Sequence, residues 1–195
     1  MNIVLLGPPC SGKGTQAKMI KNLIGAEHIS TGDLLRESIS SGSIIGLQAA
    51  EYIDQGKLVS SNIISDIIKN SISDICTYTD TNILFDGYPR NADQAKELDN
   101  ILYSFNKKVD LVIELSMYDK NILIYRMIER NKLSNRTDDT VDIIKDRLDI
   151  YYKEIENISD YYTNNSITIH TVPAHKNKSE VFGEIMKIIS INSIT

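Results

Sequence analysis

The chain has 195 residues, of which 42% are hydrophobic and 24% charged, and its formal net charge is −5. A chain of this length folds as one compact domain without help from disulfides or a metal. The acidic balance argues against general affinity for nucleic acids or membrane surfaces. The cysteines and histidines have no metal-ligand spacing, so no structural zinc is expected. No segment has the composition of a targeting signal or a membrane span, so we expect a cytoplasmic protein.

Five short apolar segments, rich in residues that favour β-structure, alternate along the chain with stretches of helical period. This alternation predicts an α/β fold, in which a parallel sheet is covered by helices on both faces. A ligand is then expected at the carboxyl edge of the sheet, where several of these segments end in small or polar residues. The predicted strands are residues 2–6, 28–30, 82–85, 110–115 and 166–172.

Two segments do not fit simple connections between strand and helix. Residues 31–61 are long for one connection and contain Gly42, Gly46 and Gly56, which predict a small helical insertion broken at the glycines. Residues 131–139 are polar and predict a mobile loop. This loop would separate a helix that ends near Arg130 from one that runs from Thr140 to about Tyr162.

The segment directly after the first predicted strand has the sequence GPPCSGK, from Gly7 to Lys13. This G-x-x-x-x-G-K spacing, between a strand and a helix, is typical of a P-loop. In such a loop the backbone amides and the positive end of the helix surround phosphate groups, and the lysine bridges phosphate oxygens. A chance glycine-rich turn is the alternative, but the motif, the strand and the helix all favour the P-loop.

Gly14 stands where the strict P-loop has Ser or Thr, and Thr15 follows it. This G-K-G-T variant resembles the nucleoside monophosphate kinases and above all the adenylate kinase family. Cys10 stands where the family usually has glycine; if the position requires a positive φ, cysteine costs on the order of 1 kcal/mol. Cys10 is then either a reactive thiol beside the positive loop or a harmless small residue. The resemblance implies an ATP site of Cys10, Ser11, Gly12, Lys13, Gly14, Thr15, Arg126, Arg130 and Lys176.

Three further segments resemble the part of the family that binds the nucleoside monophosphate. STGDLLR, which ends at Arg36, resembles the opening of a monophosphate-binding insertion at about residues 30–59, and GKLV resembles its close. DGYPR, from Asp86 to Arg90, follows the third predicted strand. The resemblance assigns Asp86 to magnesium through water, whereas a helix N-cap is the alternative. The implied AMP site is Thr31, Arg36, Lys57, Leu58, Val59, Gly87, Tyr88, Pro89, Arg90, Gln94, Arg136 and Arg147.

The remaining arginines surround the predicted loop. Arg126 and Arg130 lie four residues apart, on one face of the preceding helix, where like charges repel unless an anion compensates them. The loop, taken as about residues 130–139, resembles the short lid of zinc-free adenylate kinases, with Asn135 in place of a usual glycine. A solvated helix face is the alternative for these arginines. The residues implied to act on the transferred group are Lys13, Arg90, Arg130, Arg136 and Arg147.

The resemblance covers essentially the whole chain and implies a single P-loop domain, three-layered, with a five-stranded parallel sheet. The implied reaction is MgATP + AMP ⇌ 2 ADP, catalysed by a monomer that uses Mg²⁺ with ATP and needs no general base. A UMP or CMP kinase on the same scaffold is a first alternative, although Thr31 and Gln94 favour adenine. A catalytically silent nucleotide-binding protein is a second, suggested by Cys10 and Asn135.

Overall fold

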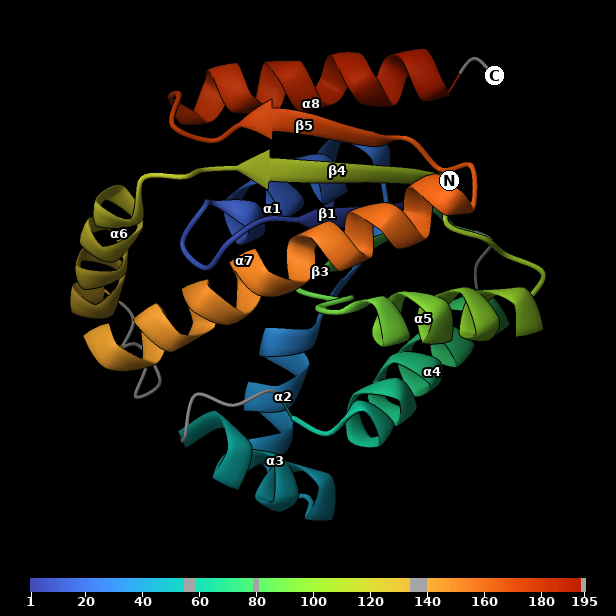
Figure 1. The fold of residues 1–195 in the computed structure, drawn as a ribbon. Helices are drawn as coiled ribbons and strands as arrows, with labels where there is room; N and C mark the ends of the chain where they lie inside the picture. Colours follow the sequence, from blue (N-terminus) through green and yellow to red (C-terminus); the bar gives the residue numbers. More distant parts are fainter. Residues whose placement is uncertain (55–58, 79–80, 134–139, 194–195) are drawn as a thin grey trace.

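The computed structural model describes residues 1–54, 59–78, 81–133 and 140–193. Within these ranges the chain alternates between strands and helices, with two additional helices between β2 and β3 (Figure 1). The elements are β1 (Asn2–Leu6), α1 (Lys13–Ile24), β2 (Glu27–Ser30), α2 (Thr31–Ser40), α3 (Ile44–Asp54), α4 (Ser61–Tyr78), β3 (Ile83–Asp86), α5 (Ala92–Ser104), β4 (Leu111–Ser116), α6 (Lys120–Leu133), α7 (Val141–Asn164), β5 (Ile169–Pro173) and α8 (Lys178–Asn192).

The five strands form one sheet in the order β2-β3-β1-β4-β5, and every neighbouring pair is parallel. The predicted α/β fold with a five-stranded parallel sheet is therefore confirmed. After β1 the chain first builds the side of the sheet that holds β3 and β2, and then crosses to the other side for β4 and β5. The carboxyl end of β1 is thus the point where the winding direction reverses, which is where open α/β sheets bind their ligands.

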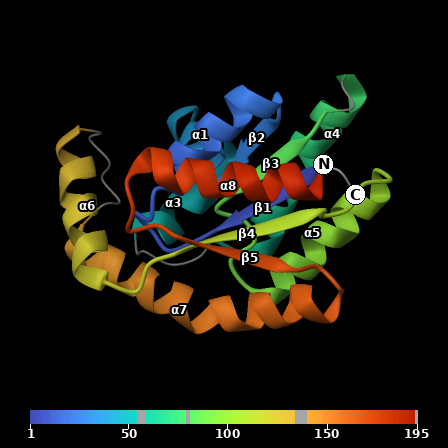
Figure 2. The ribbon, with the colours of Figure 1, turned by 90° about the horizontal axis from the view of Figure 1, so that it is seen from above.

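Helices cover both faces of the sheet (Figure 2). Ile3 and Leu5 of β1 are buried in a cluster with residues of α1 and α8, whereas Val4 and Leu6 are buried in a second cluster with residues of α4 and α5. Side chains of a strand point alternately to the two faces, so a strand covered on both sides must be apolar throughout, as β1 is. Helix α6 lies beyond the carboxyl ends of β4 and β5 (Figure 1).

The boundary between α7 and β5 differs from the prediction. We expected a strand from residue 166, but α7 continues to Asn164, and Ser166 has a φ of 62°. A left-handed residue just after a helix reverses the chain and cannot begin a strand. The strand therefore begins only at Ile169. The start of α7 agrees with expectation, because Thr140 is its N-cap and accepts a hydrogen bond from the Ile143 amide at 3.3 Å.

Helix α6 is longer than predicted. It was expected to end near Arg130, but it runs to Leu133, so the first three residues of the predicted loop are helical. An ion pair between Lys132 and Glu129, one turn apart at 2.7 Å, supports this last turn. Residues 134–139, the rest of the predicted lid, lie outside the described residues.

The predicted helical insertion contains α2 and α3, which project below the sheet in Figure 1. Gly42 lies between the two helices with a φ of 66°, as expected of a break, and Gly56 lies outside the described residues. The expectation was wrong for Gly46, which lies inside α3. A Cβ at Gly46 would lie 2.0 Å from the carbonyl oxygen of Ser38 in α2. Glycine is therefore required there because the backbones of the two helices meet.

Gly46 and Gly183 provide a matched pair of helical glycines with opposite expectations. In a helix, Gly→Ala normally stabilises by roughly 0.5–1 kcal/mol. In the described part of the chain, no atom outside the adjoining backbone of α8 lies within 4 Å of a Cβ placed on Gly183, so Gly183→Ala should raise the free energy of unfolding by that amount. Gly46→Ala should instead lower it by on the order of 1–3 kcal/mol, because backbone must move. Urea denaturation measures both, and equal stabilisation by the two substitutions would contradict the close packing of α2 on α3.

Candidate active site

A cleft of about 770 Å³ opens at the carboxyl ends of β1 and β3. It is lined by the loop after β1, the start of α2, the segment after β3, and parts of α6, α7 and the loop between β5 and α8. Lys57, Leu58 and Arg136 lie outside the described residues. The structure brings all other predicted site residues together here: Cys10, Ser11, Gly12, Lys13, Gly14, Thr15, Thr31, Arg36, Val59, Asp86, Gly87, Tyr88, Pro89, Arg90, Gln94, Arg126, Arg130, Arg147 and Lys176.

The loop after β1 has the geometry of an anion-binding nest. Gly7 and Gly12 have positive φ values of 149° and 99°, and a Cβ on Gly7 would lie 2.8 Å from the carbonyl oxygen of Leu115 in β4. Gly12 is the N-cap of α1, and no acidic residue stands in the first turn of that helix. The first amides of α1 and the positive end of its dipole are therefore directed at the cleft, which favours a phosphate group.

Cys10 has a φ of 63°, so the condition under which we expected strain is met. A non-glycine residue in this region costs on the order of 1 kcal/mol. The loop nevertheless stays closed, because the Ser11 amide donates to the carbonyl oxygen of Pro8 at 3.1 Å. The Cys10 side chain is partly buried.

Lys13 lies within the loop and donates its ammonium group to the carbonyl oxygens of Gly7 and Pro8, the latter at 3.0 Å. Burial of the ammonium lowers its pKa to about 8. The nearby carboxylate of Asp86 acts in the opposite direction, whereas Arg90 adds to the lowering. The loop thus holds a cation at a cost in desolvation, which a bound phosphate would offset.

Three arginines of the cleft are held by hydrogen bonds or an ion pair to protein oxygens. Arg126 spans two loops, because it donates to the carbonyl oxygens of Ser11 at 3.3 Å and Ala174 at 3.1 Å. It therefore joins the phosphate loop to the segment after β5. Arg36 pairs with Asp33 at 2.5 Å, and Arg90 donates through Nε to the carbonyl oxygen of Gly87 at 2.9 Å. These contacts place the guanidinium groups before any anion arrives.

The polar groups of the predicted AMP side are linked to one another. Thr31 is buried and donates its hydroxyl to the carbonyl oxygen of Gly87 at 3.0 Å. Gln94 is also buried and accepts a hydrogen bond from the Arg90 amide at 2.9 Å. The start of α2 is therefore joined to the segment after β3. This bond fixes the distance between these two segments, which together carry the predicted AMP residues.

Asp86 ends β3 as a buried carboxylate and lies 3.5 Å from Nε2 of His28 on β2. The alternative that Asp86 caps a helix is wrong, because Asn91 caps α5 and accepts from the Gln94 amide at 2.8 Å. His28 carries no motif that predicts a role in the site. Its approach to Asp86 follows from the pairing register of β2 and β3. His28 is opposite Leu84 and is thus diagonal to Asp86 on the same face of the sheet.

The donor set around Asp86 fits a hydrated magnesium ion. Mg²⁺ in proteins keeps several waters and binds through one or two carboxylates. Asp86 supplies one carboxylate beside the loop, since a Cβ on Gly14 would lie 3.5 Å from its Oδ2. Thr15 also lines the cleft. Over the described residues there is no group of three or more His, Cys, Asp and Glu side chains that could hold a metal directly.

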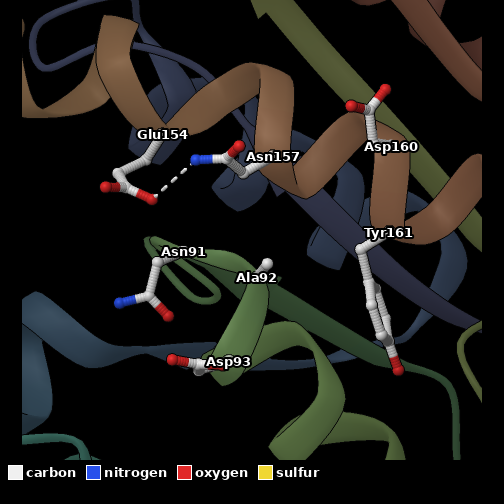
Figure 3. Close-up of a pocket in the computed structure, with 7 residues that line it drawn as sticks. All are labelled: Asn91, Ala92, Asp93, Glu154, Asn157, Asp160 and Tyr161. Atoms are coloured by element: carbon white, nitrogen blue, oxygen red, sulfur yellow. Dashed lines mark hydrogen bonds between the residues drawn. The ribbon is translucent and has the colours of Figure 1, made fainter.

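A second pocket of about 500 Å³ lies between α5 and α7 (Figure 3). It contains acidic side chains from both helices, and neither lysine nor arginine lines it among the residues that the structure describes, so it is unsuited to phosphate groups. The side chains of Asn157 and Glu154 are joined by a hydrogen bond of 3.3 Å. The lining residues are Asn91, Ala92, Asp93, Glu154, Asn157, Asp160 and Tyr161.

Comparison with known proteins agrees with this geometry. Residues 5–167 match the sequence model of a family described as adenylate kinase. The chain belongs to the adenylate kinase family. Proteins named adenylate kinase from Rhodococcus erythropolis, Methanothrix thermoacetophila and Porphyromonas gingivalis are 38%, 36% and 37% identical to it. These matches cover 88%, 97% and 97% of this chain and 91%, 99% and 95% of the relatives.

The match to these relatives therefore extends over nearly the whole chain. It includes the two helices of the insertion and the start of α7. In the part of this adenylate kinase family member that the structure describes, no helix is long and apolar enough to cross a bilayer. The assignment of individual site residues to ATP, AMP or magnesium stays a prediction.

The lowered pKa of Lys13 gives this family member a testable pH dependence. A phosphate group favours the charged ammonium, so its binding should raise a pKa that starts at about 8. ADP binding at pH 8 should therefore take up protons, and the affinity should fall as the pH rises through about 8. Calorimetry in two buffers with different ionisation enthalpies measures this uptake. Lys13→Met should abolish it and Lys21→Met, on the exposed face of α1, should retain it; uptake in both variants would contradict the assignment.

Proposed function

We propose that this adenylate kinase family member transfers a phosphoryl group reversibly from MgATP to AMP, giving two molecules of ADP. The observation that carries the proposal is the cleft itself, in which a P-loop and arginines from α2, α6, α7 and the segment after β3 surround one space. Two nucleotides brought end to end place all their phosphates in one region, and this arrangement needs positive charge from several directions at once.

The ATP side of the site is built on the phosphate loop. The amides at the start of α1 and the ammonium of Lys13 would bind the β- and γ-phosphates of ATP. Arg126 and Lys176 lie at the neighbouring wall, where Arg126 already joins the loop to Ala174. Asp86, through water, and Thr15 would hold magnesium, which when bound neutralises charge on the phosphate oxygens.

The AMP side is built on α2 and the segment after β3. Arg36 and Arg90 would bind the phosphate of AMP through bidentate hydrogen bonds, which suit guanidinium better than ammonium. Thr31 and Gln94 would contact the adenine. The insertion at residues 30–59 and the lid at residues 130–139 would close over the two nucleotides and exclude water, so that ATP is not hydrolysed.

Catalysis in this proposal is alignment and charge neutralisation. The phosphate of AMP is largely a dianion at neutral pH, because its second pKa is about 6, so no side chain has to remove a proton. Arg130 and Arg147, with Arg136 of the lid, would bind the transferred group as its charge spreads over its oxygens. One chain supplies both halves of the site, so a monomer suffices, and no structural zinc is required.

A coupled assay with AMP, UMP, CMP and GMP as acceptors tests the proposal. The wild-type protein should form ADP with AMP at a kcat/KM at least about tenfold above the other acceptors, a difference that hydrogen bonds to the base readily produce. A preference for UMP or CMP would instead support the pyrimidine kinase. Nucleotide binding without transfer to any acceptor would support the silent nucleotide-binding protein.

A substitution of Arg90 tests the proposed division of the cleft into an ATP side and an AMP side. Arg90→Ala should raise the KM for AMP by about tenfold or more, since a charged hydrogen bond to the phosphate is lost, while the KM for ATP stays within about twofold. Arg90→Lys serves as the control, because it keeps the charge but not the planar donor pair. An unchanged response to AMP in Arg90→Ala would contradict the assignment.

A further inference from the structure

Glu114 is an acidic residue in the middle of a strand whose other side chains are mostly apolar and buried. In the sheet it lies between Leu6 of β1 and Thr171 of β5. Leu6 is the last residue of β1, so Glu114 lies in the sheet next to the residue from which the phosphate loop begins. A charge in such a place is costly unless hydrogen bonds compensate it, and its presence therefore requires an explanation.

Both oxygens of Glu114 accept hydrogen bonds. The hydroxyl of Tyr151 on α7 donates to Oε1 at 3.0 Å, and the hydroxyl of Thr171 donates to Oε2 at 3.5 Å. Burial and the charge of Glu114 raise the pKa of Tyr151, so its hydroxyl keeps its proton and remains a donor. The carboxylate thus connects the sheet to the middle of α7.

Tyr151 also lines the nucleotide cleft, together with Arg147 and Ile150 of the same helix. Arg147 precedes Tyr151 by four residues, so the two side chains lie on one face of α7. Any rotation or sliding of α7 on the sheet that broke the Tyr151–Glu114 bond would also move the guanidinium of Arg147 in the cleft.

We propose that Tyr151 and Glu114 are a positioning pair, whose hydrogen bond sets the rotation of α7 on β4 so that Arg147 is directed at the transferred phosphoryl group. The proposal rests on the proposed function, in which Arg147 binds that group. Catalysis by alignment is sensitive to the position of each group that binds the transferred phosphoryl group. A displacement of such a group by about 1 Å can lower the rate by up to about a hundredfold.

Helix α7 offers a matched control at its other end. Tyr161 donates its hydroxyl to Asp99 of α5 at 2.8 Å, which is the same kind of tyrosine–carboxylate bond. Tyr161 points from α7 toward α5, beside the acidic pocket (Figure 3). It does not line the nucleotide cleft. Tyr161→Phe should therefore cost stability as Tyr151→Phe does, but without the kinetic effect.

The experiment is a mutant cycle of Tyr151→Phe with Arg147→Ala, measured as kcat and as the KM values for ATP and AMP. Tyr151→Phe should lower kcat about tenfold in the wild-type background, but less than about twofold once Arg147 is absent, because it acts through Arg147. Its KM for ATP should stay within about twofold. Tyr161→Phe should keep kcat within about twofold. As the conservative variant, Glu114→Gln keeps the acceptor and should retain more activity than Glu114→Leu.

Two results would overturn the positioning pair while leaving the proposed function in place: an unchanged kcat in Tyr151→Phe, or the same fold loss in both backgrounds of the cycle. If the wild-type protein forms no ADP, the proposed function fails by itself. The same cycle is then measured by calorimetry with MgADP as the probe. Non-additive losses of affinity would support the pair, whereas additive losses or no loss would reject it.

Discussion

The fold depends on one constraint at the end of β1. This strand is buried on both faces and ends at Leu6, and at the next residue, Gly7, no side chain fits against the backbone of β4. Since β3 and β4 occupy its two sides, the chain can leave only into the space above the carboxyl edge of the sheet. The loop that forms there directs its amides and the start of α1 into that space. A ready anion-binding site is therefore a consequence of how the central strand ends.

The chain as a whole is acidic, whereas its described arginines gather around this site. The chain as a whole carries a net charge of −5, yet it has only six arginines, and the five that the structure describes all line the cleft. Holding cations in this cleft is unfavourable, because burial lowers the pKa of Lys13 and the nearby guanidinium groups of Arg90 and Arg130 add to the lowering. Asp86 is a buried acidic residue of the cleft, and the half-buried Glu114 beside it is held by hydrogen bonds from Tyr151 and Thr171. The repulsion that remains between Lys13 and the neighbouring arginines would be reduced by a bound phosphate group.

The parts of the cleft are held in place by different kinds of contact. The phosphate loop is tied to the segment after β5 by Arg126, and α7 is tied to the sheet and to α5 by tyrosine hydroxyls. The insertion is held differently, because α2 and α3 pack on each other through Gly46 while they project from the sheet. A base cross-linked by these hydrogen bonds, with a separately packed insertion, suits a site that must align two ligands and also admit them.

The sequence by itself determined the loop after β1, the parallel α/β class, the approximate strands and helices, and the five described arginines that line the cleft. These features depend on residues close together in the chain, where spacing and period carry the information. Only the tertiary structure decided the strand order, the approach of His28 to Asp86 and the bond between Tyr151 and Glu114. Each of these joins residues far apart in sequence, because it depends on which strand edges meet and how each helix is rotated on the sheet. No local pattern contains that information.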